Sequence, residues 1–257
     1  MRARTASLMQ LILTLAFAVL GSVLASFAGV IAERIHTGQS FLKGRSRCNS
    51  CNRYLAPRDL VPVFSWLLAR GRCRTCSVRI PGLYALTEAF LGAAFALTYW
   101  TFGLTLVLPF FLLALFVLTF TVLYDLRHTI VPQWASTTLT VLGLIIAALN
   151  AQTITVFGTT VLTAGIIALA FFLLYALSRG RAMGLGDTPI AFALSLMVAP
   201  YAVAGLLFSF WIGAIVGMLI LFMRRGGPRM GIEVPFVPFL ALGYVVALFI
   251  QWNPLSF

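Results

Sequence analysis

The sequence predicts an all-α, polytopic helical membrane protein with about eight transmembrane helices. We also expect a small polar segment between the first and second of them. The first observation is composition: the 257 residues are 61% hydrophobic and 9% charged, whereas soluble domains carry about 25% charged residues. The second is a mean hydropathy of +1.02. These values exclude a soluble globular enzyme, a disordered chain and a fibrous repeat.

The third observation is a series of apolar runs, which a membrane span of roughly 20 residues requires. The runs fall at about 8–31, 83–103, 104–124, 130–149, 156–177, 188–203, 204–223 and 235–252. The first run follows two arginines, as in a signal peptide. It is too long for one and has no small-residue cleavage site followed by polar sequence, so we interpret it as a retained span.

The cations lie almost entirely on one predicted face of the membrane. Ten are in the polar segment and six are in later loops of the same face: Arg34, Lys43, Arg45, Arg47, Arg53, Arg58, Arg70, Arg72, Arg74, Arg79, Arg127, Arg179, Arg181, Arg224, Arg225 and Arg229. The opposite face carries Arg2 and Arg4. The positive-inside rule therefore places the polar segment in the cytoplasm and both termini outside. The net charge of +12 follows this topology, and we expect no nucleic-acid partner.

All four cysteines lie in the polar segment, as Cys48-Asn-Ser-Cys51 and Cys73-Arg-Thr-Cys76. Two such pairs separated by about 20 residues are typical of a structural zinc site with four thiolates. Two disulfides or four free thiols are the alternatives, but a reducing cytoplasmic face disfavours disulfides. A segment of about 50 residues builds little core alone, so a bound metal would supply folding energy.

Two aspartates are expected at the same edge of the membrane. Asp125 ends one apolar run, and Asp187 precedes another in the motif Gly184-Leu-Gly186-Asp187. Paired carboxylates in a low-dielectric site do not both ionise easily, so such a pair can act as general acid and base on an amide. Helix dipoles favour Asp187 as the ionised base and Asp125 as the acid. Gly184 and Gly186 allow a substrate backbone to approach closely.

Each of these residues also has a purely structural interpretation. Asp187 could cap a helix, and Asp125 could pair with Arg127 or His128 among the headgroups. Glu88, near the start of the second predicted span, could be the interfacial partner of an arginine.

Taken together, several motifs in one order resemble the bacterial type IV prepilin peptidases, the leader peptidase/N-methyltransferase family with a GxGD aspartic site. The motifs are Ala25-Ser-Phe-Ala-Gly-Val-Ile-Ala-Glu-Arg34, Ser46-Arg-Cys-Asn-Ser-Cys51, Pro62-Val-Phe-Ser-Trp66, Gly71-Arg-Cys-Arg-Thr-Cys76, Tyr84-Ala-Leu-Thr-Glu88, Asp125-Leu-Arg-His-Thr-Ile-Val-Pro132, Gly184-Leu-Gly-Asp187 and Val234-Pro-Phe-Val-Pro-Phe-Leu-Ala-Leu-Gly243.

The resemblance implies an enzyme of the bacterial inner membrane that acts on prepilins or pseudopilins of pilus or type II secretion systems. It would cleave their leader on the cytoplasmic side and then methylate the new N-terminus with S-adenosylmethionine. Asp125 and Asp187 carry over as the catalytic pair, the four cysteines as zinc ligands, and Glu88 as a residue of the methyltransferase half.

We therefore divide the chain into a first transmembrane helix at 1–31, a zinc segment at 32–82 and a membrane-embedded peptidase part at 83–257. The main alternative is another GxGD protease, similar to signal peptide peptidase, although that class lacks a four-cysteine segment. A zinc-bearing membrane scaffold without activity is a further alternative. A transporter is disfavoured because the middles of the spans are almost wholly apolar.

Overall fold

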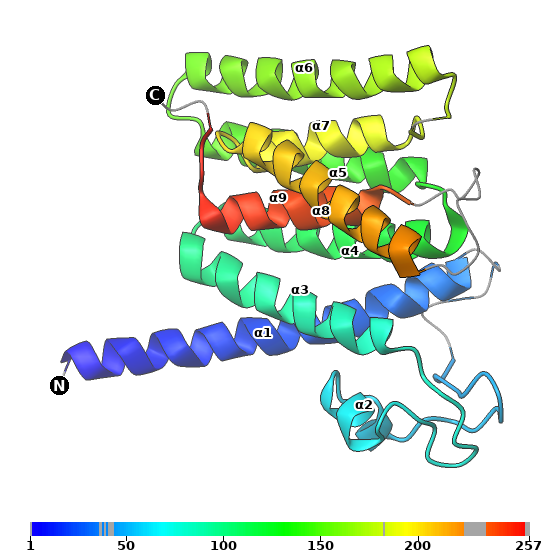
Figure 1. Cartoon of the computed structure of the whole chain (residues 1–257). Coiled ribbons are helices and arrows are strands. Elements are labelled where there is room, and N and C mark those ends of the chain that lie inside the picture. Colours follow the sequence, from blue (N-terminus) through cyan, green and yellow to red (C-terminus); the bar gives the residue numbers. More distant parts are fainter. Residues whose placement is uncertain are drawn as a thin grey trace. The chain divides into compact units, whose positions relative to one another are not determined.

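The computed structural model describes residues 2–35, 38, 40, 44–181, 183–223 and 235–254, with side chains from Leu8 onward. Lys43, Arg224, Arg225 and Arg229 of the predicted cationic face lie outside these ranges. The helices within them are α1 (Arg2–Arg34), the 3-10 turn η2 (Pro57–Asp59), α2 (Phe64–Leu68), α3 (Gly82–Phe102), α4 (Leu108–His128), α5 (Gln133–Asn150), α6 (Ile154–Ser178), α7 (Asp187–Met197), α8 (Ala202–Met223) and α9 (Val237–Ile250) (Figure 1).

The all-α class is confirmed, and each of the eight predicted apolar runs coincides with one helix of 11 residues or more. A count of eight spans is not confirmed. Five described helices, α1, α4, α5, α6 and α8, have the length and hydropathy to cross a membrane. By contrast, α7 has 11 residues and α9 has 14, so they extend about 16 and 21 Å at 1.5 Å per residue. A hydrocarbon core is about 30 Å thick, so neither crosses it as a single straight helix.

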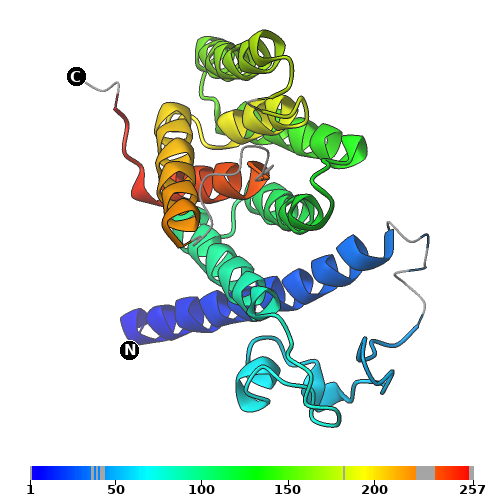
Figure 2. The same ribbon diagram turned by 45° about the vertical axis from the view of Figure 1, so that its right-hand side comes forward.

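The chain forms two compact units, residues 1–104 and 105–257. In the first unit α1 and α3 run in opposite directions and pack against one another (Figure 1), and they cross at an angle (Figure 2). Small residues allow this close approach: a Cβ added at Gly21 would lie 2.6 Å from the Leu91 carbonyl oxygen, and one at Gly92 would lie 2.8 Å from that of Ala18. Small residues at helix crossings are typical of membrane proteins, because backbone packing there replaces the hydrophobic effect.

In the second unit the two short helices form the interior. The residues of α9 with 0% exposure are Val237, Leu240, Tyr244 and Ala247, and α7 contributes the equally buried Ile190, Ala191 and Ala193. A helix that is apolar and buried on most sides belongs inside a bundle. The Tyr244 and Ser195 hydroxyls, 2.7 Å apart, join α9 to α7 in this interior.

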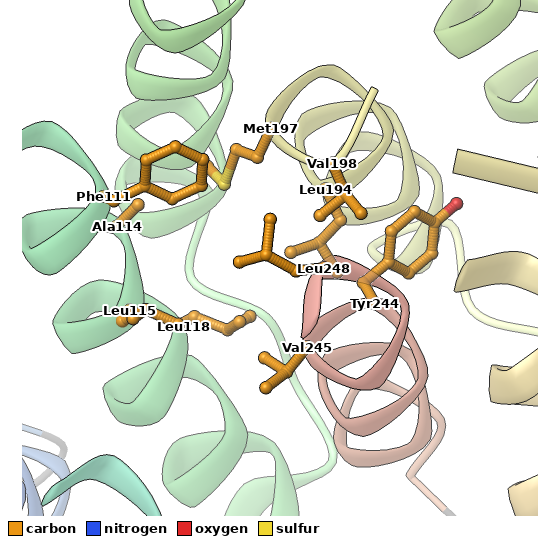
Figure 3. A pocket seen from close by; sticks show the side chains of 10 residues that line it. All are labelled: Phe111, Ala114, Leu115, Leu118, Leu194, Met197, Val198, Tyr244, Val245 and Leu248. Carbon is orange, nitrogen blue, oxygen red and sulfur yellow. The ribbon is translucent and has the colours of Figure 1, made fainter. Parts of the chain in front are cut away.

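A small cavity lies among α4, α7 and α9 (Figure 3). Its walls are apolar side chains such as Leu118, Leu194 and Leu248, and the Tyr244 hydroxyl points away from it. It contains no group that could perform acid or base chemistry. Asp125 lies seven residues beyond Leu118 on α4, which is about 10 Å along the helix axis.

The α1–α3 crossing gives a testable prediction. Gly92→Ala places a methyl group against the Ala18 backbone, so we expect it to lower the unfolding temperature of the detergent-solubilised chain by several degrees. Gly165→Ala is the matched control, since nothing lies within 4 Å of a Cβ at that helical glycine. Equal unfolding temperatures for the two variants would contradict the crossing.

Candidate functional site

The first unit contains two cysteine hairpins with the same backbone. The Cys48 amide donates to the Arg53 carbonyl and the Asn52 amide to the Cys48 carbonyl, both at 2.9 Å. At the same offsets, Cys73 donates to Val78 and Ser77 to Cys73, again at 2.9 Å. The residue after each second cysteine is left-handed, with φ of 56° at Asn52 and 59° at Ser77. Each hairpin therefore folds so that both of its thiols point to one side.

The four sulfur atoms of Cys48, Cys51, Cys73 and Cys76 lie within 4.8 Å of one another, and all four thiols are free. The Sγ atoms of Cys48 and Cys76 are 3.8 Å apart. Four ligands placed 2.3 Å from one zinc ion in a tetrahedron would be separated by about 3.8 Å. A disulfide requires about 2.05 Å. The donor set and its spacing therefore fit a tetrahedral metal ion.

Local hydrogen bonds prepare the second hairpin for metal binding. The backbone amides of Cys76 and Thr75 lower the pKa of the Cys73 thiol to about 6, because donated hydrogen bonds stabilise the thiolate. A thiolate is the form that binds a metal.

Asp59 joins the two hairpins, and the sequence analysis missed this role. One carboxylate oxygen accepts from the Arg53 guanidinium of the first hairpin at 2.8 Å, and the other lies 3.3 Å from Arg74 Nε of the second. Burial alone would raise the pKa of Asp59, but the Ala56 amide and the two arginines outweigh it and lower the pKa. The signal in the sequence was that Asp59 is the one acid between Arg34 and Arg79, a stretch with ten cations.

Two further carboxylates connect the polar segment to the long helices of the same unit. Glu33 near the end of α1 accepts from the Asn49 side chain at 3.2 Å. Glu88 on α3 accepts from the Val63 amide at 2.7 Å. Glu88 thus holds Val63, the residue just before α2. The structural alternative from the sequence was an ion pair between Glu88 and an arginine, whereas this hydrogen bond is to a backbone amide.

The second unit holds the two predicted aspartates. Asp125 and Asp187 are the charged side chains buried in the described part of the chain, with 5% and 7% exposure. Asp125 lies in the last turn of α4, where the left-handed Thr129 ends the helix by donating to the Asp125 carbonyl. Asp187 begins α7. The end of one helix and the start of another therefore meet at the same end of this unit.

The two carboxyl groups are close enough to repel one another electrostatically. The Val237 amide, at the start of α9, faces the Asp125 carboxyl group. The His128 ring packs against Tyr124 in a tilted arrangement, with ring centroids 4.6 Å apart and an interplanar angle of 46°. The Asp125 Oδ2 atom is buried and has no hydrogen-bond partner among the residues of the described ranges.

Asp187 is not the N-cap of α7. Gly186 occupies that position without a side-chain cap, and Asp187 Oδ2 instead accepts from the Gly184 amide at 3.2 Å. The two glycines have different surroundings. A Cβ at Gly186 would lie 3.1 Å from the Val131 Cβ, whereas one at Gly184 would have the Asp187 carboxylate as its nearest neighbour, at an ordinary 3.6 Å. Gly186 therefore allows α7 to pack against the α4–α5 connection that follows Asp125.

These features define a helical membrane protein with a buried carboxylate pair and a four-cysteine segment between its first two long helices. The chain belongs to the type IV leader peptidase family. The model described as type IV leader peptidase family matches residues 111–222, and the bacterial peptidase A24 N-terminal domain matches residues 19–102. The predicted family is thus confirmed.

Curated relatives include three proteins named prepilin leader peptidase/N-methyltransferase. The Myxococcus xanthus protein is 33% identical over 82% of this chain and 64% of its own length. The Legionella pneumophila protein is 30% identical over 80% and 72%, and the Bacillus subtilis protein is 26% identical over 93% and 95%. The chain therefore spans slightly less than two thirds of the Myxococcus relative. No solved structure matches it.

The cysteine cluster predicts one tightly bound zinc ion per chain. Cys73→Ser removes a ligand, so we expect elemental analysis to show loss of metal and limited proteolysis to cut within residues 44–81. Thr75→Ala changes the same hairpin without removing a ligand and should keep the metal. A metal-free chain with an equally protected segment would contradict the prediction.

Asp59→Asn tests the link between the hairpins. Groups that orient metal ligands typically contribute 10- to 100-fold to affinity, so we expect zinc affinity to fall by about 10-fold. Because the folded-state pKa of Asp59 lies below its unfolded value, its contribution is complete at neutral pH and is lost only as the pH falls through the folded value. Competition with a chelator at pH 7 measures the effect, and unchanged affinity would count against the link.

Proposed function

We propose that this chain is a prepilin leader peptidase in which Asp125 and Asp187 activate water. The observation that supports this best is the burial of two mutually repelling carboxylates in a unit whose interior is otherwise uncharged across the described residues. Burying such groups opposes folding, because charge is desolvated there without a cation. Perturbed carboxylate pairs in proteins are concentrated at functional sites.

The pair would hold one proton between its two carboxyl groups. The ionised carboxylate removes a proton from water as the oxygen attacks the carbonyl carbon of the scissile bond. The protonated carboxyl donates its proton to the carbonyl oxygen. When the tetrahedral gem-diol collapses, one of its hydroxyl groups returns a proton to the carboxylate that donated it, the C–N bond breaks, and the nitrogen leaves as an amine with the proton taken from water. The unpartnered Asp125 Oδ2 is available to the water or the substrate in this scheme.

The assignment of Asp187 as the general base and Asp125 as the general acid stays a prediction. Burial and the neighbouring Asp125 act against ionisation of Asp187, whereas the Gly184 amide favours it, since a donated hydrogen bond stabilises a carboxylate. The Val237 amide acts on Asp125 in the same sense and so reduces the difference between the two groups.

The substrate would be a prepilin or pseudopilin, as the relatives' names indicate. Its apolar helix would lie in the bilayer, with a basic leader on the cytoplasmic side. We place the aspartates, the polar segment and the described loop arginines on that side of the bacterial inner membrane, with both termini on the other. Arg127 lies two residues beyond Asp125, and Arg179 ends α6, which supports this orientation.

We further propose that the chain methylates the new N-terminus with S-adenosylmethionine, which supplies the methyl group. This part is supported by the relatives' names. Glu88 belongs to the methyltransferase part of the family by resemblance, and its hydrogen bond to Val63 would hold the polar segment in place. Zinc bound to Cys48, Cys51, Cys73 and Cys76 would stabilise that segment.

Replacement of either aspartate tests the peptidase. Asp125→Asn or Asp187→Asn should lower cleavage of a purified prepilin in detergent by about 100- to 10,000-fold, because a general acid or base contributes that much. Membrane abundance should not change, and methylation of a pre-cleaved pilin should persist. Full activity of either variant would exclude the pair, and cleavage of unrelated membrane helices but not prepilin would indicate the other GxGD class.

The glycines provide a sharper test of geometry. Gly186→Ala pushes against Val131, so we expect at least about 10-fold slower cleavage, since an ångström of displacement costs up to about 100-fold. Gly184→Ala keeps the amide that holds Asp187 and should stay within about twofold of the parent. Val131→Gly combined with Gly186→Ala removes the Cβ and Cγ2 atoms that the new methyl group would meet, and should restore activity. If Gly184→Ala is the more harmful change, the glycines instead serve substrate approach.

A further inference from the structure

The short helix α2 turns its apolar side chains outward. Phe64, Leu67 and Leu68 share one helix face and are 66%, 56% and 77% exposed. Trp66 lies on the other side, where its indole nitrogen donates to the Ile80 carbonyl and its ring contacts Gly71. Trp66 therefore fixes α2 to the segment, while the side chains of the outward face stay largely exposed.

Contacts within the same unit fix the depth of α2 along the membrane helices. Val63, just before α2, is bonded to Glu88, which lies six residues and about 9 Å into α3. On α1, Gly29 faces Tyr84 and Gly21 faces Leu91, so the level of Glu88 falls between these two glycines. That level is inside the apolar stretch Leu8–Arg34. The start of α2 is therefore at the depth where exposed atoms meet lipid.

Cations follow the apolar face directly. Arg70, Arg72 and Arg74 line a hollow just after α2, together with Ala69, Cys73 and Ser77. Arg74 is paired with Asp59, whereas Arg70 and Arg72 form no ion pair with the described residues. An apolar face inserted about 5–10 Å beside free cations is the arrangement of helices that bind anionic bilayer surfaces.

We propose that α2 is an interfacial anchor that holds the four-cysteine segment on an anionic lipid surface. Phe64, Leu67 and Leu68 enter the boundary between headgroups and acyl chains. Arg70 and Arg72 bind lipid phosphates. The proposal uses the unit 1–104 alone and does not depend on peptidase activity.

Photo-crosslinking of the full chain in lipid vesicles tests this anchor. p-Benzoylphenylalanine is placed at position 64 or 68 and, as a control, at position 75, an exposed polar site of the second hairpin. In vesicles containing phosphatidylglycerol, we expect lipid adducts by mass spectrometry at 64 and 68, and at least fivefold fewer at 75. Adducts to residues 105–257 would overturn the proposal in favour of contact within the chain, and absence of lipid adducts at both positions would indicate exposure to water.

The charge contribution is measured separately. Arg70→Gln with Arg72→Gln should reduce the adducts at position 68 at least threefold in phosphatidylglycerol vesicles at low salt, and should leave them unchanged in phosphatidylcholine. Arg58→Gln is the matched control for loss of a cation outside the hollow. An equal yield from the double variant and the parent in anionic vesicles would overturn the lipid-phosphate role of the two arginines.

Discussion

The burial of two neighbouring carboxyl groups within an apolar bundle is the constraint on which the second unit depends. Each group opposes folding when it is charged, and repulsion adds to that penalty when both are ionised. Packing of the surrounding helices offsets this penalty, since α7 and α9 are buried in the interior. The Ser195 hydroxyl on α7 and the Tyr244 hydroxyl on α9 form a hydrogen bond with one another, which joins the two helices. Gly186 then allows α7 to lie against Val131, so helix packing sets the position of Asp187 directly.

The first unit lacks a large hydrophobic core in the described part of its polar segment. Among the described residues of that segment between α1 and α3, Cys73 is the one buried hydrophobic side chain. Stability has to come from connections: sulfur atoms arranged for a metal, Asp59 between the hairpins, and carboxylates on α1 and α3 that bind the segment. Small metal-binding modules generally replace a hydrophobic core in this way.

Much of this arrangement was readable in the sequence, because hydropathy and residue spacing are local properties. Apolar runs located the long helices, and the Cys-x-x-Cys pairs located the sulfur cluster. The sequence did not predict that α7 ends after 11 residues, because a buried helix and a span have the same composition. It also missed Asp59 and the Glu88–Val63 bond, since both depend on tertiary contacts across 6 to 25 residues.

The shortness of α7 has a consequence for how a substrate would be chosen. A helix that begins at Asp187 and extends about 16 Å into the second unit leaves that carboxylate at one end of the unit. In the proposed peptidase, such a site would select a bond by its height above the apolar part of the substrate. The length of the segment beyond that bond would be left unconstrained, so one site would accept leaders of different lengths.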